Sequence, residues 1–276
     1  MLIELFSYGF IQRALASGLL IGLLCSVLGV FLVLRRLSLI GDGLAHVTFG
    51  GVALALFAGL QGAAMVLVSL PVVVLASLGI LKLATKSRLG GDAAIGIVSS
   101  AGVASGVLLA VAGRGYGVDL FSYLFGNILS ITQTELIVAA CLCLFVLGML
   151  WLFYHDLVAL TFNEELARVS GIKIRFLNSL LAILTALTVV LAMRLVGIML
   201  ISALLILPAS TALQVARGFK MTVLFSVLSA TLAIISGIVI SFILNIPSGA
   251  TIILSSLILF GISVVAKNMK KQTFDR

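Results

Sequence analysis

Long apolar segments separated by short polar stretches make up almost the whole chain. A helix needs about 20 apolar residues to cross the hydrocarbon core of a bilayer, and roughly nine segments approach that length. We therefore expect an all-α, polytopic membrane protein with about nine transmembrane helices, within a range of about eight to ten. A further segment, 118–130, is too short to span. The pattern predicts helices at 14–34, 39–59, 63–82, 92–112, 133–154, 176–193, 195–215, 221–244 and 249–267.

Composition supports this reading and indicates one domain. Hydrophobic residues make up 62% of the chain and charged residues only 9%, whereas about 25% of the residues in soluble domains are charged. Because no polar linker divides the sequence, we expect residues 1–276 to form a single transmembrane domain. The N-terminus has no basic region ahead of an apolar stretch, so we expect no cleaved signal peptide. The first dozen residues are predicted to lie along the membrane surface.

The distribution of positive charge predicts an orientation. Basic loops stay on the cytoplasmic side of a membrane, and with nine spans 14 of the 17 Lys and Arg residues fall on one side. The three exceptions are Arg13, Arg114 and Arg194. We therefore predict an external N-terminus and a cytoplasmic C-terminus. The net charge of +8 is explained by these loops, and we expect no nucleic-acid partner.

Asp42 and His46 are the most informative polar pair in the apolar sequence. Positions four apart share one face of a helix, and carboxylate plus imidazole is a partial ligand set for zinc, manganese or iron. If the helix begins near Ser38, the pair lies about 9–16 Å inside the cytoplasmic edge, where ionisable groups are costly and generally functional. Two copies related by a two-fold axis would supply enough ligands for a four-coordinate site. The alternative interpretation is that Asp42 caps the helix and His46 is a hydrogen-bonded packing residue.

A second informative stretch, 162–172, lies in the longest polar loop on the predicted cytoplasmic side. It suits a short helix, with Glu164 and Glu165 near its N-terminus and Gly171 as its C-terminal stop. By itself this pattern is typical of a surface helix, although its apolar positions would equally allow it to dock a partner.

The sequence lacks the motifs of an ATPase or a metalloprotease. Gly-Lys is nowhere followed by Ser or Thr, so there is no phosphate-binding loop, and His-Glu-x-x-His is also missing. We therefore expect a transport subunit without enzyme activity. If ATP drives transport, another polypeptide must hydrolyse it.

Six stretches together resemble the permease subunit of the bacterial ATP-binding-cassette (ABC) importers for divalent metals. This family includes zinc, manganese and iron(II) uptake systems, and the likeness covers nearly the full length in the family's order. The matching stretches are LRRLSLIGDGLAH at 34–46, DAAIGI at 92–97, LFGNIL at 124–129, FNEELARVSGI at 162–172, VG through LLILPA at 196–209, and PSG at 247–249.

The resemblance implies a type II importer-like permease in the bacterial cytoplasmic membrane. Such a permease is a homodimer that works with two cytoplasmic ATP-binding subunits and an extracytoplasmic metal-binding protein. The family's metal position falls on Asp42 and His46, and its ATPase-coupling helix falls on Glu165, Ala167 and Gly171. The likeness favours zinc as cargo, with manganese or iron(II) as alternatives, and implies no permanently bound cofactor.

Two other functions are compatible with the residues. Asp42 and His46 would also serve a proton-coupled secondary metal carrier that needs no ATPase. A membrane scaffold or an intramembrane enzyme is the third possibility. If the pair binds metal, transport is expected to fail at low pH, because protons compete with the metal for carboxylate and imidazole.

Overall fold

The computed structural model describes residues 9–60, 64–86, 90–112 and 131–274, and these ranges contain helices and no β-strand. The predicted short segment at 118–130 and the predicted surface placement of residues 1–8 lie outside the described ranges. The helices are α2 (Gly9–Leu34), α3 (Ile40–Phe57), α4 (Ala64–Lys86), α5 (Gly91–Ala112), α7 (Gln133–Leu152), α8 (Tyr154–Phe162), α9 (Glu164–Val169), α10 (Ile174–Val196), α11 (Ile198–Val215), α12 (Phe219–Leu244) and α13 (Ser248–Phe274).

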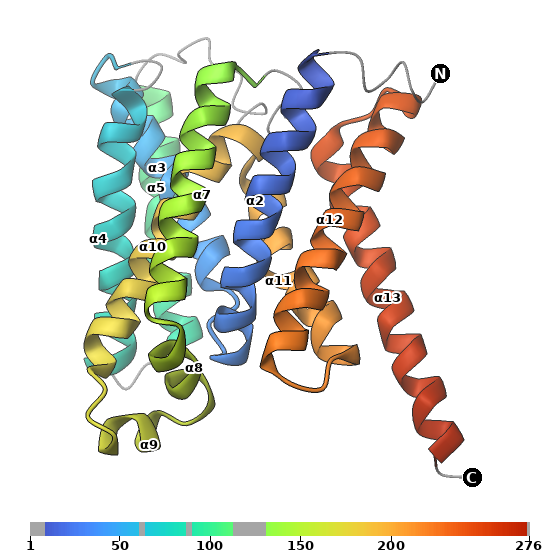
Figure 1. Cartoon of the computed structure of the whole chain (residues 1–276). Coiled ribbons are helices and arrows are strands. Elements are labelled where there is room, and N and C mark those ends of the chain that lie inside the picture. The colour runs from blue at the N-terminus through green and yellow to red at the C-terminus, as the bar shows by residue number, and fades with distance from the viewer. Residues whose placement is uncertain (1–8, 61–63, 87–89, 113–130, 275–276) are drawn as a thin grey trace.

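The apolar helices confirm the predicted membrane architecture. Eight of the helices described here are long and apolar enough to cross a bilayer, and α11 contributes a shorter apolar stretch, Leu200–Val215. Each of the nine predicted segments corresponds to one of these helices. The start of α2 and the end of α13 lie at opposite ends of the bundle (Figure 1), as an odd number of passes requires.

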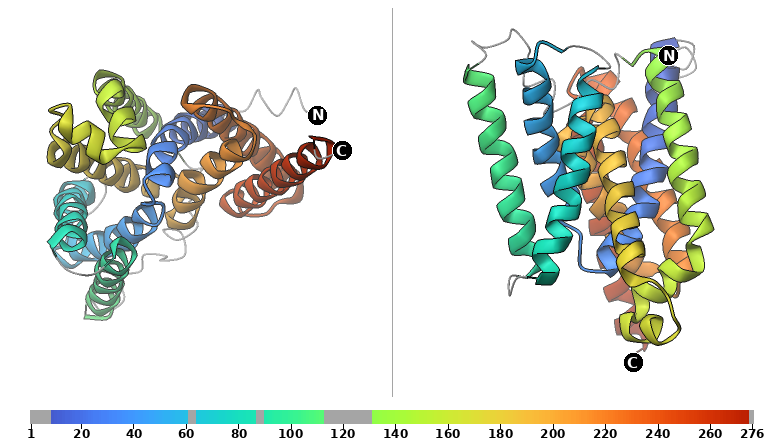
Figure 2. Two further views of the ribbon diagram at one scale, coloured as in Figure 1. Left: turned by 90° about the horizontal axis from the view of Figure 1, so that it is seen from below. Right: turned by 90° about the vertical axis from the view of Figure 1, so that its left-hand side faces the viewer.

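The bundle has an inner and an outer set of helices. About two thirds of the apolar windows of α2, α3 and α10 are buried (67% each), compared with 22% for α4, α5 and α7. Figure 2 shows α2 and α3 running through the middle of the end-on view, with α4, α5 and α7 around the edge. The outer helices present leucine, valine and phenylalanine outward, as lipid-facing surfaces do.

Glycines fix α3 tightly against α5. A Cβ added to Gly102 would lie 2.7 Å from Val47 Cα, and one added to Gly106 would lie 2.6 Å from the Phe49 ring. Because only glycine permits such a close approach of two helix backbones, the Gly102/Gly106 spacing allows α5 to pack closely on α3. The contact positions α3, and with it Asp42 and His46.

The short helix α9 projects at the same end of the bundle as α8 and the last residues of α13 (Figure 1). Asn163 caps it by accepting hydrogen bonds from the backbone N–H groups of Glu165 and Leu166, both at 3.0 Å. Gly171 follows it with a left-handed φ of 79°, and Ile172 N–H donates back to the Ala167 carbonyl at 3.1 Å. This is the geometry of a glycine-terminated helix, so the predicted short helix and its stop at Gly171 are confirmed.

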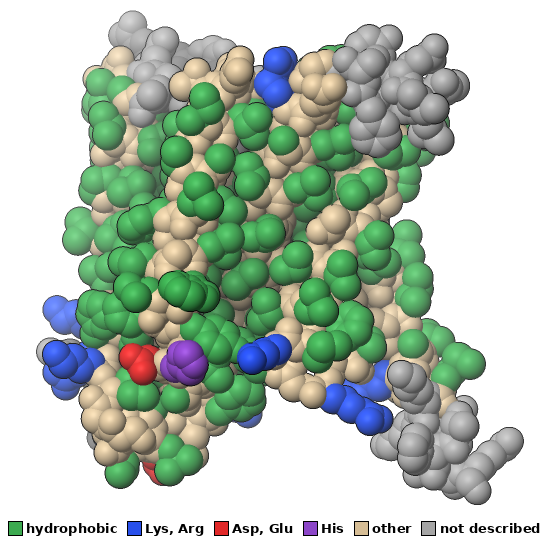
Figure 3. Space-filling model, in the orientation of Figure 1, with side chains coloured by type: hydrophobic (Ala, Val, Ile, Leu, Met, Phe, Trp, Pro, Cys, Tyr) green, Lys and Arg blue, Asp and Glu red, His purple; other side chains and the backbone are tan. Residues whose placement is uncertain are grey.

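Basic side chains gather at this end of the molecule, around α8, α9 and the lower ends of α12 and α13, below a band of hydrophobic and uncharged side chains (Figure 3). The grouping matches the predicted clustering of Lys and Arg on one side of a membrane.

Alanine substitution at Gly102 is expected to destabilise the protein by about 1–3 kcal/mol, because the added methyl group overpacks against the α3 backbone. Gly96→Ala is the matched control on the same helix, since a Cβ there meets nothing within 4 Å. Thermal unfolding of the detergent-solubilised protein would measure both variants. Equal melting temperatures for Gly102→Ala and Gly96→Ala would contradict the proposed contact.

Candidate metal site

Asp42 lies in the first turn of α3, and His46 lies one turn further along. The helix begins at Ile40, two residues later than the sequence-based estimate near Ser38. Asp42 and His46 therefore lie about 3 Å and 9 Å along the axis from the first residue of the helix, about 3 Å less than a start at Ser38 would give at 1.5 Å per residue. Leu39 occupies the N-cap position, and no side chain caps the helix there. Asp42 is thus not the N-cap of α3. The alternative interpretation of Asp42 as a helix cap is therefore wrong, whereas a packing role for His46 is not affected.

Three polar groups converge at this point. His46 Nε2 lies 3.7 Å from Asp42 Oδ2, and the Ser202 hydroxyl donates a hydrogen bond of 3.0 Å to Asp42 Oδ1. Ser202 belongs to α11, so the site joins two helices that are distant in sequence. One carboxylate oxygen is held by Ser202, while the other faces the imidazole.

The site is open on one side within this single copy. The side chains of Asp42 and His46 are 47% and 35% exposed, although neighbours on α3 such as Leu44, Ala45 and Val47 are buried. The described helices of this copy therefore leave one stripe of α3 uncovered. The carboxylate and imidazole are available to an ion, to water or to a second chain on that side.

The chemistry of the three groups suits a divalent metal. Imidazole nitrogen and carboxylate oxygen are ligands of zinc, manganese and iron(II), and a hydrogen bond to a ligating carboxylate fixes its orientation. Among the described residues, no group of three or more His, Cys, Asp and Glu side chains comes together. One copy thus offers Asp42 and His46 as candidate ligands, and the Ser202 hydroxyl is bonded to the carboxylate.

Ser202 is the site residue that sequence reasoning missed. It lies 160 positions from Asp42, so no spacing rule connects the two. The one sequence feature that could have pointed to Ser202 is that it is the first polar residue in the apolar stretch 198–209, which contributes to the family resemblance.

The residues predicted for ATPase coupling lie on and beside α9 but differ in exposure. Glu165 and Gly171 are exposed, whereas Ala167 is only 2% exposed and packs inward. The large apolar side chains that protrude are Leu166 and Val169, at 65% and 86% exposure. Ala167 therefore anchors α9 to the bundle, and its neighbours form the outer face.

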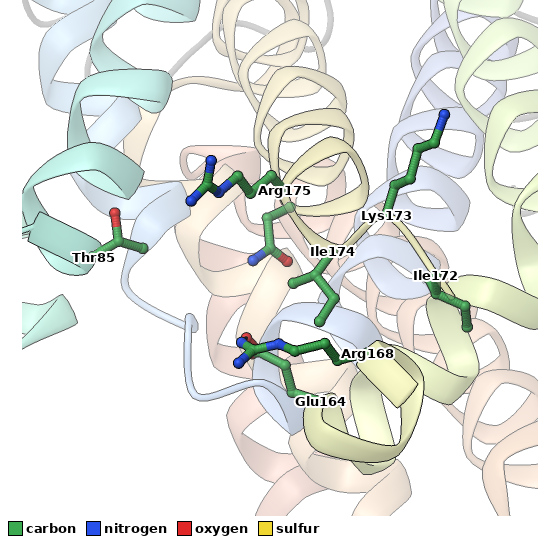
Figure 4. A pocket seen from close by; sticks show the side chains of 8 residues that line it. Thr85, Glu164, Arg168, Ile172, Lys173, Ile174 and Arg175 are labelled. Carbon is green, nitrogen blue, oxygen red and sulfur yellow. The ribbon is translucent and has the colours of Figure 1, made fainter. Parts of the chain in front are cut away.

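A cavity of about 570 Å³ opens between α9, the start of α10 and the end of α4. Figure 4 shows the Arg168 side chain beside Glu164 and the Arg175 side chain extending toward Thr85, while Lys173 points away. A second cavity of about 540 Å³ includes Ser170 and Gly171 in its lining. The surface around α9 is thus indented as well as apolar at its tip.

Comparison with known proteins shows a family match over almost the whole chain. Residues 7–267 match the ABC 3 transport family. The chain is 35% identical over 260 residues to the manganese transport system membrane protein MntC of Halalkalibacterium halodurans, covering 94% of this chain and 88% of that protein. It is also 35% identical over 251 residues to the high-affinity zinc uptake system membrane protein ZnuB of Haemophilus influenzae, covering 91% of this chain and 95% of that protein.

A solved structure shares the fold. PsaBC from Streptococcus pneumoniae, determined in complex with a Fab, contains a chain that superposes with a TM-score of 0.84 at 33% sequence identity. The match covers 95% of each chain, so the two chains share one fold over nearly their full length.

Replacement of Ser202 by alanine is expected to weaken binding of Zn²⁺ or Mn²⁺ to the purified protein by roughly 10-fold or more, the usual effect of losing an outer hydrogen bond to a ligand. Isothermal titration with each metal would measure this. Ser210→Ala, on the same helix but not bonded to Asp42, is the control and should bind as the wild type does. Unchanged affinity in Ser202→Ala would show that the hydroxyl does not orient a ligand.

Proposed function

Because the chain belongs to the ABC 3 transport family, we propose that it is the permease through which an ATP-driven importer moves a divalent metal ion into the cytoplasm. Family membership makes it a permease of an ABC-type metal import system. The finer proposal has three parts: zinc is the preferred cargo, ATP is hydrolysed on separate subunits, and two copies of this chain form the pathway.

The observation that carries the proposal is the Asp42–His46 pair on the open stripe of α3. Its ionisable groups lie 3.7 Å apart and are partly exposed in one copy. Most other charged residues of the chain lie at the ends of the apolar helices or in the segments between them. Ionisable groups in such a setting generally serve ion pathways. Two copies meeting at this stripe would supply two carboxylates and two imidazoles, which complete a four-coordinate site.

A site of this kind suits transport. The metal needs deprotonated carboxylate and neutral imidazole ligands, so binding is reversible and pH-dependent. We propose that the two copies alternate between outward-open and inward-open arrangements around the bound ion. The clustering of basic side chains near α9 (Figure 3) supports a cytoplasmic position for α9 and for the C-terminus.

Cargo identity is proposed from ligand chemistry. Nitrogen and oxygen ligands suit zinc, and manganese or iron(II) are alternatives. The sequence likeness extends equally to a manganese and a zinc system, each at 35% identity, so the proposal of zinc rests on the ligand chemistry. An extracytoplasmic metal-binding protein that delivers the ion is the expected partner on the other side of the membrane.

The face of α9 formed by Leu166 and Val169 is the proposed ATPase contact. Both side chains protrude at the end of the bundle where basic residues gather. Exposed apolar side chains outside the lipid region mark a protein interface. Glu165 and Gly171 flank this face, and buried Ala167 transmits its movement to the bundle.

Substitution of Asp42 by Asn or of His46 by Ala is expected to lower ATP-dependent metal uptake at least roughly 10-fold, because each removes a ligand and even outer-sphere losses cost this much in affinity. Uptake of zinc, with manganese and iron(II) as competitors, would be measured in proteoliposomes containing the assembled complex. Asp92→Asn is the matched control, since Asp92 is also a carboxylate in the first turn of an apolar helix. Wild-type uptake in both site variants would refute the assignment.

The same assay separates the importer from the secondary carrier. Proteoliposomes containing this chain alone, with a proton gradient and no ATPase subunits, should take up no metal. Gradient-driven uptake under those conditions would favour the proton-coupled carrier. Preference for manganese over zinc in the competition would correct the cargo while leaving the importer intact.

The double substitution Leu166→Ser/Val169→Ser is expected to reduce co-purification of the ATPase subunits by at least about 10-fold, because truncating buried apolar anchors costs about 2 kcal/mol or more at an interface. Val111→Ser, near the far end of α5 and 74% exposed, is the control for loss of an exposed apolar side chain. Retention of the ATPase by the double variant would exclude this face as the contact.

A further inference from the structure

The turn between α2 and α3 contains a buried positive charge. Arg35 follows directly after α2, and its side chain is only 10% exposed. Its Nη2 lies 4.0 Å from Glu164 Oε2, and within the described part of the chain its buried Nη1 has no hydrogen-bond partner. Burial lowers the pKa of Arg35, and the Glu164 carboxylate opposes that shift. A buried cation of this kind depends on its counter-charge.

Glu164 supplies that counter-charge from the first residue of α9. Its other oxygen, Oε1, lies 3.5 Å from Arg168 Nη2, one turn along the same helix. The two contacts differ in kind, because Arg168 is 72% exposed and belongs to α9 itself. Of the two ion pairs of Glu164, the one with Arg35 connects α9 to the turn between α2 and α3.

The connection from Arg35 to the metal site is short and stiff. Arg36 adopts a left-handed φ of 58°, and Leu37 N–H donates back to the Leu32 carbonyl at 2.8 Å, so the turn closes the end of α2 as a hydrogen-bonded unit. Ile40 N–H then donates to the Leu37 carbonyl at 3.1 Å. Little slack separates Arg35 from Asp42, which lies seven positions later.

We propose that Arg35 is a positioning residue that links α9 to the metal site: Glu164 pulls on Arg35, and the α2–α3 turn passes the displacement to Asp42. The proposal rests on the proposed function, in which α9 docks on the ATPase. At 4.0 Å the pair is longer than the hydrogen-bonded distance of about 2.7–2.9 Å for charged groups. A movement of α9 can therefore tighten or release it, and the free Nη1 provides a second donor for the tightened state.

The test compares Arg35→Gln, Glu164→Gln and the double variant with the wild type in the complete complex. Uptake per ATP hydrolysed is expected to fall about 2- to 30-fold in each single variant, the range seen for substitutions between coupled sites. Because both substitutions break the same Arg35–Glu164 contact, uptake per ATP in the double variant should be no lower than in the more impaired single variant. Metal binding to the isolated permease and co-purification of the ATPase should remain at wild-type levels.

Arg168→Gln is the matched control. It removes the second partner of Glu164 by the same Arg-to-Gln change but leaves the Arg35 contact, so uptake per ATP should stay near the wild-type value. Arg35→Lys keeps the charge and should restore part of the coupling that Arg35→Gln loses. If Arg35→Gln fails to fold, Glu164→Gln still tests the link, since it changes a half-exposed residue (49%).

Two results would overturn the link. One is wild-type uptake per ATP in Glu164→Gln, and the other is a double variant whose losses are the product of the single losses. If the wild-type complex itself shows no ATP-dependent uptake, the proposed function fails and the link fails with it. Coupled uptake by the wild type together with unaffected variants would overturn the link alone.

Discussion

The cost of placing a charge in lipid determines most of this structure. A bilayer provides no hydrogen-bond partners, so the backbone must satisfy itself as helices, and charged side chains are driven to the ends of those helices. The described chain follows this rule closely, because most of the basic side chains visible in Figure 3 lie at one end and one lies at the opposite end. Asp42 and His46 lie in the first two turns of α3, next to that basic end, on an open stripe of the helix. Ser202 fixes one oxygen of Asp42, and the glycine contacts with α5 hold this part of α3 in place.

Much of the fold was predictable because the signals for membrane helices are strong and local. All nine apolar segments were placed. Gly171 was recognised as the stop of a short helix, because glycine readily adopts the left-handed conformation that ends a helix. The start of α3 was predicted about two residues early, because Leu39 is as apolar as the helix that follows it. The orientation of Ala167 was not predictable either, since a six-residue helix has too few turns to show an apolar face.

The parts of the site that escaped prediction are long-range. Asp42 and His46 are four residues apart and were found from helix periodicity, whereas Ser202 approaches Asp42 only because α11 packs beside α3. The Arg35–Glu164 pair has the same origin. Both residues were visible in the sequence as members of basic and acidic stretches, but their pairing requires the end of α2 to meet the start of α9. The preferred metal could not be predicted for a different reason, because carboxylate and imidazole bind zinc, manganese and iron(II) alike.

The place of Asp42 in the first turn of α3 also bears on biosynthesis. A carboxylate at the centre of a nascent segment disfavours its partition into the bilayer by about 2.5–3.5 kcal/mol on insertion scales. Near the N-terminal end the helix dipole favours a negative charge, and Arg35 and Arg36 adjoin that end in the sequence. The position of Asp42 at the start of α3 therefore lowers the cost of inserting a helix that carries a carboxylate.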